Sequence, residues 1–188
     1  MTRAPLLLGL ALGASFWLAA CGEQKAEAPP PRELTAEAVG HFCGMNLMEH
    51  VGPKGQILLA SRPEPVWFSS ARDAVAFSLL PEEAKDIRAI YVSDMAKAPT
   101  WEEPGASNWI DARKAVFVIG SRLKGGMGAD ETVPFSERAK AEAFAAENGG
   151  RVVGFNEIPR DYVLGSGEAT GAAPDATGQR PDPSRSTH

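Results

Sequence analysis

The chain has 188 residues, and 24 acidic against 19 basic side chains give it a formal net charge of −5. It contains no basic block and no interleaving of basic with aromatic residues, so nucleic acid is not expected as a partner. Between two low-complexity ends lie roughly 130 residues, enough for one compact domain or two small subdomains.

The N-terminal segment predicts a lipoprotein signal peptide over residues 1–20. One basic residue, Arg3, precedes an apolar run that is too short for a comfortable transmembrane helix. Residues 18–21, Leu-Ala-Ala-Cys, resemble a bacterial lipobox, which implies that a lipid on Cys21 holds the mature chain on a membrane. Gly22 follows in place of aspartate, which favours the outer membrane over the inner membrane, with the domain facing the periplasm. The alternative is an ordinary signal or an uncleaved anchor.

Two further segments are predicted to lack a fold of their own. Residues 21–33 are polar and end in three prolines before Arg32, which is typical of an extended, flexible tether. Residues 165–188 contain no large apolar side chain, so we expect a disordered tail.

The residues between these ends predict an α+β fold of two similar β-β-α-β units, 34–98 and 99–164, packed together. Residues 68–77 align with 135–144 at half of their positions, which indicates a duplication, although two alanine-rich helices could match independently. Ser70 and Ser136 are placed to cap the two helices, which should end near Leu80 and at Gly149. The predicted strands are 57–60, 66–68, 87–92, 115–119, 132–135 and 151–155.

A cluster of soft metal ligands begins the first unit. Cys43, Met45, Met48 and His50 fall within eight residues, and sulfur donors favour a polarisable ion such as Cu(I). In an extended strand Cys43 and Met45 would point the same way, and His41 would share their face. With Cys21 lipidated, Cys43 has no disulfide partner in an oxidising compartment, so it is either a small buried hydrophobe or a ligand.

A second sulfur donor is expected from the second unit. Gly125-Gly126-Met127-Gly128 surrounds one methionine with glycines that allow close approach to another surface. Met127 either fills a gap in the core or completes a site begun by Cys43 and Met45. The roles of His41, Met48 and His50 stay open.

These motifs together resemble the NosL family. The resemblance rests on the lipobox, Cys43-Gly44-Met45, residues 49–56, residues 109–112, residues 125–128 with 133–135, and Gly149-Gly150. It implies an exported copper-binding lipoprotein, not an enzyme, that supplies Cu(I) for the copper–sulfide centre of nitrous oxide reductase. It also implies that the partners are this reductase and its membrane-associated ABC-type assembly complex, and that the copper ligands are Cys43, Met45 and Met127.

Two functions of other classes compete with copper delivery. In an exported enzyme, Cys43 would be a nucleophile activated by His41 or His50, with Asp94 or Asp111 orienting the imidazole. The chain has no Cys-x-x-Cys pair or nucleophile elbow to support this. In a scaffold lipoprotein, the domain would dock a membrane complex without carrying metal.

Overall fold

The computed structural model describes residues 27–165. The predicted signal peptide, the lipidation site Cys21, the first part of the tether and nearly all of the predicted tail therefore lie outside the described residues. Within the described residues, no helix is long and apolar enough to cross a membrane.

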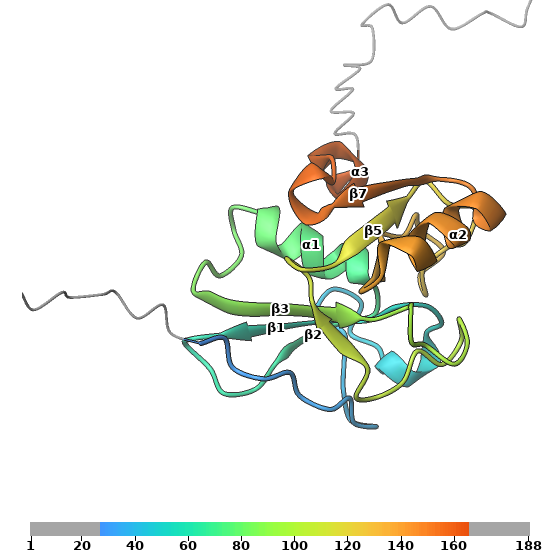
Figure 1. The fold of residues 1–188 in the computed structure, drawn as a ribbon. Helices are drawn as coiled ribbons and strands as arrows, with labels where there is room; N and C mark the ends of the chain where they lie inside the picture. The colour runs from blue at the N-terminus through green and yellow to red at the C-terminus, as the bar shows by residue number, and fades with distance from the viewer. Residues whose placement is uncertain (1–26, 166–188) are drawn as a thin grey trace, which may run out of the picture.

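Two antiparallel sheets, each with one helix from its own unit, make up the domain (Figure 1). The first sheet has the strand order β2-β1-β3-β4 and the second has the order β6-β5-β7. The first-unit elements are β1 (Gly55–Leu59), β2 (Val66–Phe68), α1 (Ala71–Leu79) and β3 (Ile87–Ser93), followed by β4 (Trp109–Asp111). The second-unit elements are β5 (Val116–Ile119), β6 (Val133–Phe135), α2 (Arg138–Asn148) and β7 (Arg151–Gly154).

The repeated unit predicted from the sequence is confirmed. In each unit the first strand is central, with the second strand on one side and the strand that follows the helix on the other. Strand β4 follows residue 98 in the chain, yet it pairs with β3 and so extends the first sheet. Three short helices were not predicted from the sequence: η1 (Leu47–Glu49), η2 (Phe155–Glu157) and α3 (Arg160–Leu164).

Only one of the two predicted serine caps forms. Ser70 accepts a hydrogen bond from the Asp73 backbone N–H at 3.0 Å and begins α1, which ends before Leu80 as expected. The prediction for Ser136 is wrong: α2 begins two residues later, after Glu137, and the Ser136 hydroxyl has no partner. The Ser136 backbone N–H instead donates to Asp94 Oδ1 at 2.9 Å, and this holds the residue against the first unit.

Part of the sequence assigned to the tether is held against the first sheet. Buried Gln56 bonds the Arg32 backbone twice, accepting from its N–H at 2.8 Å and donating to its carbonyl at 2.8 Å. The Tyr91 hydroxyl donates to the Pro29 carbonyl at 2.7 Å. Residues 29–33 thus cover polar groups of the sheet instead of hanging free.

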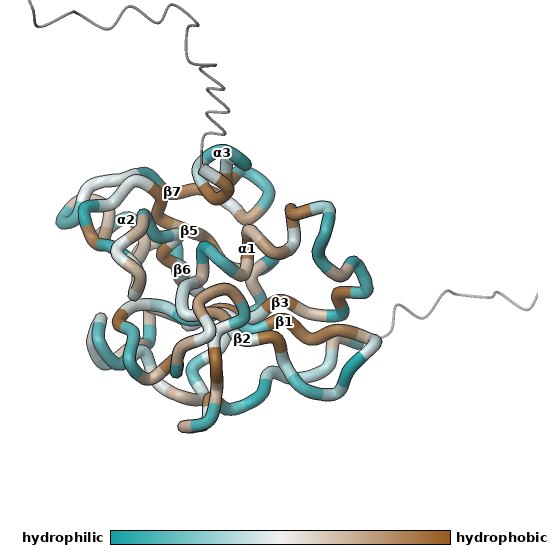
Figure 2. Tube along the Cα trace, turned by 180° about the vertical axis from the view of Figure 1, so that it is seen from behind, coloured by the Kyte–Doolittle hydropathy of each residue, from teal (hydrophilic) through white to brown (hydrophobic). Residues whose placement is uncertain are grey.

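The two units share one apolar core. Side chains from β1, β2, α1 and β3 pack in a single cluster with Phe117, Ile119 and Val153 of the second unit. Figure 2 shows apolar segments along β1, β3 and β7. A second, smaller cluster lies under α2 and includes Phe135 and Ala141. Because the larger cluster crosses between the units, neither sheet buries its apolar face alone.

Two buried ionisable side chains lie where the units meet. Glu131, two residues before β6, accepts hydrogen bonds from the Arg72 and Thr132 backbone N–H groups, both at 2.8 Å. Lys54, directly before β1, donates to the carbonyls of His50 and Gly52, both at 2.7 Å. Burial raises the pKa of Glu131 to about 8. Burial lowers the pKa of Lys54 to about 8, although the charge of Glu131 opposes this shift.

The turn after α2 generates a stability prediction. Gly149 and Gly150 both have positive φ, but a Cβ on Gly150 would also lie 2.6 Å from the Ile119 carbonyl oxygen, whereas a Cβ on Gly149 meets nothing within 4 Å. We expect Gly150→Ala to lower the free energy of unfolding by on the order of 3 kcal/mol and Gly149→Ala by about 1 kcal/mol. Urea denaturation of both variants measures the difference, and equal losses would contradict the close contact.

Glu131 generates a prediction about pH. In the folded chain it keeps its proton up to about pH 8, whereas the ordinary value is 4.5, so the folded state binds more protons between these values. The free energy of unfolding should therefore fall as pH rises, by about 2 kcal/mol between pH 5 and 7. Lys54 has the opposite sign and acts mainly above about pH 8.

Glu131→Gln should remove that fall, because the amide oxygen still accepts both backbone hydrogen bonds while the side chain no longer titrates. Exposed Glu137→Gln serves as the matched control and should keep the wild-type slope. Denaturation curves recorded across this pH range give the slopes. A Glu131→Gln slope equal to that of the wild type would contradict the assignment.

Candidate metal centre

Cys43 lies in a tight loop, residues 39–46, which we call the cysteine loop. Val39 and Asn46 form an antiparallel bridge, and the Gly40 N–H donates to the Met45 carbonyl at 2.9 Å. Gly44 has a φ of 66°, a conformation that glycine adopts without steric cost. The prediction of an extended strand with Cys43 and Met45 on one face is therefore wrong. The chain reverses here, and the Cys43 thiol approaches the backbone of Met45 within the turn.

The loop leaves the Cys43 thiol half-buried and close to an imidazole. The Cys43 Sγ atom lies 3.9 Å from His50 Nε2 and 4.0 Å from the Met45 carbonyl oxygen. A Cβ on Gly40 would lie 2.5 Å from that Sγ atom, so glycine at this position makes room for the thiol. Cys43 forms no disulfide, and it is the one free cysteine among residues 27–165.

His50 joins the thiol to the second unit. Its ring is buried, with 8% of the residue exposed, and Nδ1 lies 3.3 Å from the Gly126 carbonyl oxygen. A carbonyl only accepts hydrogen bonds, so Nδ1 carries the hydrogen, and in the neutral ring the lone pair of Nε2 faces Cys43 Sγ. A nitrogen lone pair beside a thiol is a donor set that soft and borderline metals accept.

The glycine-rich segment 125–128, which we call the methionine loop, packs on His50. A Cβ on Gly126 would lie 2.5 Å from His50 Cβ and 3.1 Å from the Val51 carbonyl oxygen. The Gly128 N–H donates to the Gly125 carbonyl at 2.8 Å, which closes the turn around Met127. The structure thus brings the methionine loop against His50, the same residue that contacts Cys43.

The methionines of both loops are exposed. Met127 is 52% exposed and Met45 is 38% exposed, so Met127 does not fill a gap in the core, as the alternative interpretation proposed. Met48 is 64% exposed, and Val39, Phe42 and Val51 are exposed in the same part of the chain. The methionine side chains of both loops are therefore accessible from solvent.

His41 does not belong to this cluster. Its Nε2 lies 3.1 Å from Glu83 Oε1, and its ring packs against Phe42, Phe68 and Phe77. The expectation that His41 shares a strand face with Cys43 is wrong, because the chain turns between them. His50, which sequence reasoning left outside the ligand set, is the histidine that meets the thiol.

The carboxylates of the hypothetical nucleophilic site lie elsewhere. Asp94 accepts from the Ser136 and Ala96 backbone N–H groups, and Asp111 accepts from the Arg113 backbone N–H. The group that orients His50 is the Gly126 carbonyl. Among residues 27–165, no three His, Cys, Asp or Glu side chains gather into a metal-binding cluster. Cys43 and His50 supply two donors here, and the further soft donors of the two loops are thioethers.

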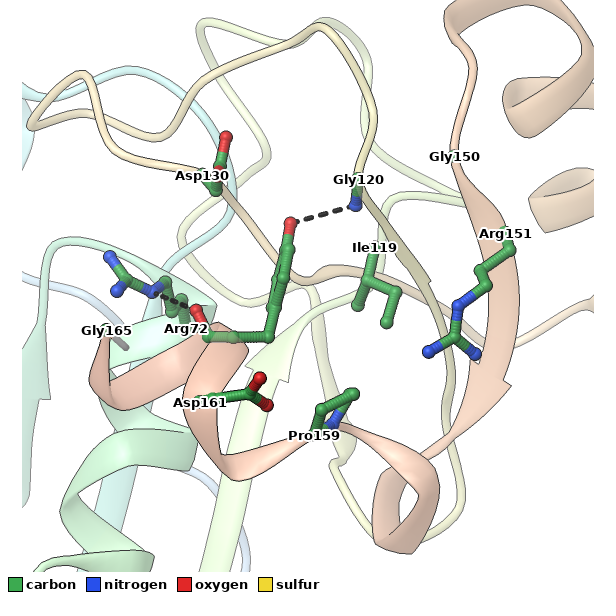
Figure 3. Close-up of a pocket in the computed structure, with 10 residues that line it drawn as sticks. Arg72, Ile119, Gly120, Asp130, Gly150, Arg151, Pro159, Asp161 and Gly165 are labelled. Atoms are coloured by element: carbon green, nitrogen blue, oxygen red, sulfur yellow. Dashed lines mark hydrogen bonds between the residues drawn. The ribbon is translucent and has the colours of Figure 1, made fainter. Parts of the chain in front are cut away.

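An open cavity of about 680 Å³ near the C-terminal helix is unrelated to this centre. Tyr162 lines it, with its hydroxyl accepting from the Gly120 N–H at 2.9 Å and its carbonyl accepting from Arg72 Nε at 3.3 Å, and Figure 3 draws both hydrogen bonds as dashed lines. Its lining side chains carry neither sulfur nor imidazole. These contacts fasten α3 to the second sheet and offer no soft ligand.

Comparison with known proteins gives consistent matches. The NosL family model matches residues 31–163. A copper-binding lipoprotein NosL of Achromobacter cycloclastes is 46% identical over 175 residues, which cover 93% of this chain and 90% of that protein. The copper-binding lipoprotein NosL of Stutzerimonas stutzeri is 35% identical over 151 residues, which cover 79% of this chain and 77% of that protein.

A solved structure matches the fold as well. The crystal structure of the copper chaperone NosL from Shewanella denitrificans superposes with a TM-score of 0.66 at 36% sequence identity. The match covers 70% of this chain and 98% of that one. With the family match spanning most of the chain, these relatives leave one conclusion: the chain belongs to the NosL family.

Proposed function

We propose that this protein carries Cu(I), bound by the Cys43 thiolate and the thioethers of Met45 and Met127. The observation that carries the proposal is the free Cys43 thiol beside His50, against which the methionine loop packs. The relatives are named as copper-binding lipoproteins and a copper chaperone, which supports copper as the cargo.

The donor chemistry suits a carrier that must also release its ion. Thiolate and thioether sulfur favour monovalent copper over hard cations, and the thiolate supplies most of the affinity. Met45 and Met127 are exposed, so an acceptor protein can exchange its own ligands for theirs one at a time. A site of few ligands near the surface keeps copper out of free solution without enclosing it.

His50 has two roles in this proposal. Its hydrogen bond to the Gly126 carbonyl keeps the methionine loop close to the cysteine loop, and its Nε2 lone pair is a further donor near the thiol. Lys54 donates a hydrogen bond to the His50 carbonyl and so fixes the backbone of His50. The first unit thus positions both the thiol and the contact that brings in the second unit.

The lipobox and the family support a cellular setting for this proposal. The mature chain carries its lipid on Cys21, is held on a membrane facing the periplasm, with the outer membrane favoured, and supplies copper for the copper–sulfide centre of nitrous oxide reductase. Its partners are that reductase and its ABC-type assembly complex. The lipoprotein names of the relatives support the anchor, and the exposed apolar side chains around Met45 suit a protein partner.

Substitution of the three sulfur ligands tests the metal site. In an anaerobic competition titration, Cys43→Ser should lower Cu(I) affinity by about a hundredfold or more, while Met45→Leu and Met127→Leu should each lower it by roughly tenfold. Met48→Leu, at a more exposed methionine outside the set, is the control and should bind as the wild type does. Unchanged Cu(I) binding by Cys43→Ser would reject Cys43 as a ligand, whereas no Cu(I) binding by the wild-type chain would leave a metal-free scaffold as the better description.

Separate substitutions of His50 and His41 test whether His50 links the cysteine loop to the methionine loop. His50→Gln should weaken Cu(I) binding about tenfold, since it removes both the ring donor and the contact with Gly126. His41→Gln removes the contact with Glu83 and the packing of the ring on the neighbouring phenylalanines, but it removes nothing at Cys43, so it should leave the affinity as it is. If the two variants lost affinity equally, His50 would have no special role at the site.

A further inference from the structure

A cavity of about 350 Å³ lies where residues 29–33 join the first sheet. Three of its lining side chains are arginines, and no carboxylate lines it. We call it the arginine cavity; the lining residues that matter here are Arg32, Arg62, Arg88, Pro29 and Leu59. Its walls combine guanidinium groups with apolar surface, a combination that suits a phosphate group bearing acyl chains.

The three arginines make no ion pair within the described part of the chain. All three are exposed. Asp86 lies next to the cavity. Its Oδ2 atom accepts a hydrogen bond from the Ser61 backbone N–H at 2.6 Å. Glu33 and Glu64 are sequence neighbours of two of the arginines but do not line the cavity. The cationic groups are thus free to meet an anion from outside.

The position of the cavity points to a membrane surface. Pro29, which lines the cavity, is eight residues from Cys21, and an extended chain of that length spans at most about 28 Å. A domain tethered this closely keeps the cavity near the headgroups of the bilayer that holds the lipid.

The candidate metal centre lies at the opposite end of the sheet. Strand β1 begins directly after Lys54, which holds the loop of His50, and it ends at Leu59, which lines the arginine cavity. In Figure 1 residue 27 enters at one end of β1, while the short cyan helix that follows the cysteine loop lies at the other end.

We propose that the arginine cavity seats on phosphate groups of anionic phospholipids and orients the domain so that the cysteine and methionine loops face away from the bilayer. This inference rests on the lipid attachment at Cys21 in the proposed function. The lipid anchor holds the cavity at a high effective concentration of headgroups, so that even a weak contact forms. This second contact fixes the orientation of the domain, which the anchor alone leaves free.

Site-resolved arginine modification tests the seat on the full lipidated chain. The chain is reconstituted on vesicles of phosphatidylcholine, or of phosphatidylcholine with phosphatidylglycerol, and treated with phenylglyoxal before peptide mass spectrometry. Arg32, Arg62 and Arg88 should react about fivefold more slowly on the anionic vesicles, whereas exposed Arg138 should react equally on both. High salt should abolish the protection. If each of the four arginines reacted at the same rate on both kinds of vesicle, the proposal would be overturned.

Two double variants test whether the three arginines bind lipid together, or whether Arg32 is protected only because it lies close to the anchor. Arg62→Ala with Arg88→Ala should remove the protection of Arg32. Arg138→Ala with Lys140→Ala, which makes the same change in net charge on α2, should retain it. Protection of Arg32 that survives in the first variant would contradict a shared site.

Two controls distinguish the possible failures. Flotation with phosphatidylcholine vesicles reports the lipid anchor alone. A chain that fails to float refutes the anchor. The modification rates on anionic vesicles then still show whether the arginines bind the headgroups. Equal protection by inorganic phosphate without vesicles would show a site for free phosphate, which overturns the membrane assignment. Full flotation without protection refutes the seat and leaves the proposed copper function intact.

Discussion

The contact between the His50 ring and the backbone of Gly126 is the constraint on which the candidate centre depends. It is the place where the loop carrying Met127 meets the unit carrying Cys43. The contact needs an unsubstituted Cα at Gly126, because any side chain would overlap His50 Cβ. A site divided between two units thus relies on a close approach of backbone to ring.

The shared core makes this contact durable. The main apolar cluster includes side chains from both sheets, so the units cannot move apart without exposing it. Glu131 and Lys54 add a polar layer at the same boundary, and each bonds backbone that leads to one of the loops. The sulfur side chains can therefore be exposed for exchange while their supports are buried. A loop on a rigid scaffold is a common way to combine access with position.

The surfaces at the two ends of β1 expose different kinds of side chain. Apolar and thioether side chains gather around the cysteine loop, while unpaired arginines gather at the other end of β1, where the chain comes from its anchor. Each end leaves side chains unsatisfied by the rest of the domain. In the proposed function one of these ends meets the membrane and the other passes the ion to a partner.

Sequence pattern alone determined most of the local structure and the chemistry. Strand periodicity, the Ser70 cap and Gly149 predicted the duplicated β-β-α-β order, and Cys43 with its methionines predicted a soft-metal site, because these signals depend on neighbours in the chain. Tertiary structure decided the rest. It placed β4 in the first sheet, moved the start of α2, fixed residues 29–33 on Gln56, and chose His50 over His41. Most of those outcomes depend on distant partners, such as Arg32, 24 residues from Gln56, and Gly126, 76 residues from His50, and no local pattern reports such contacts.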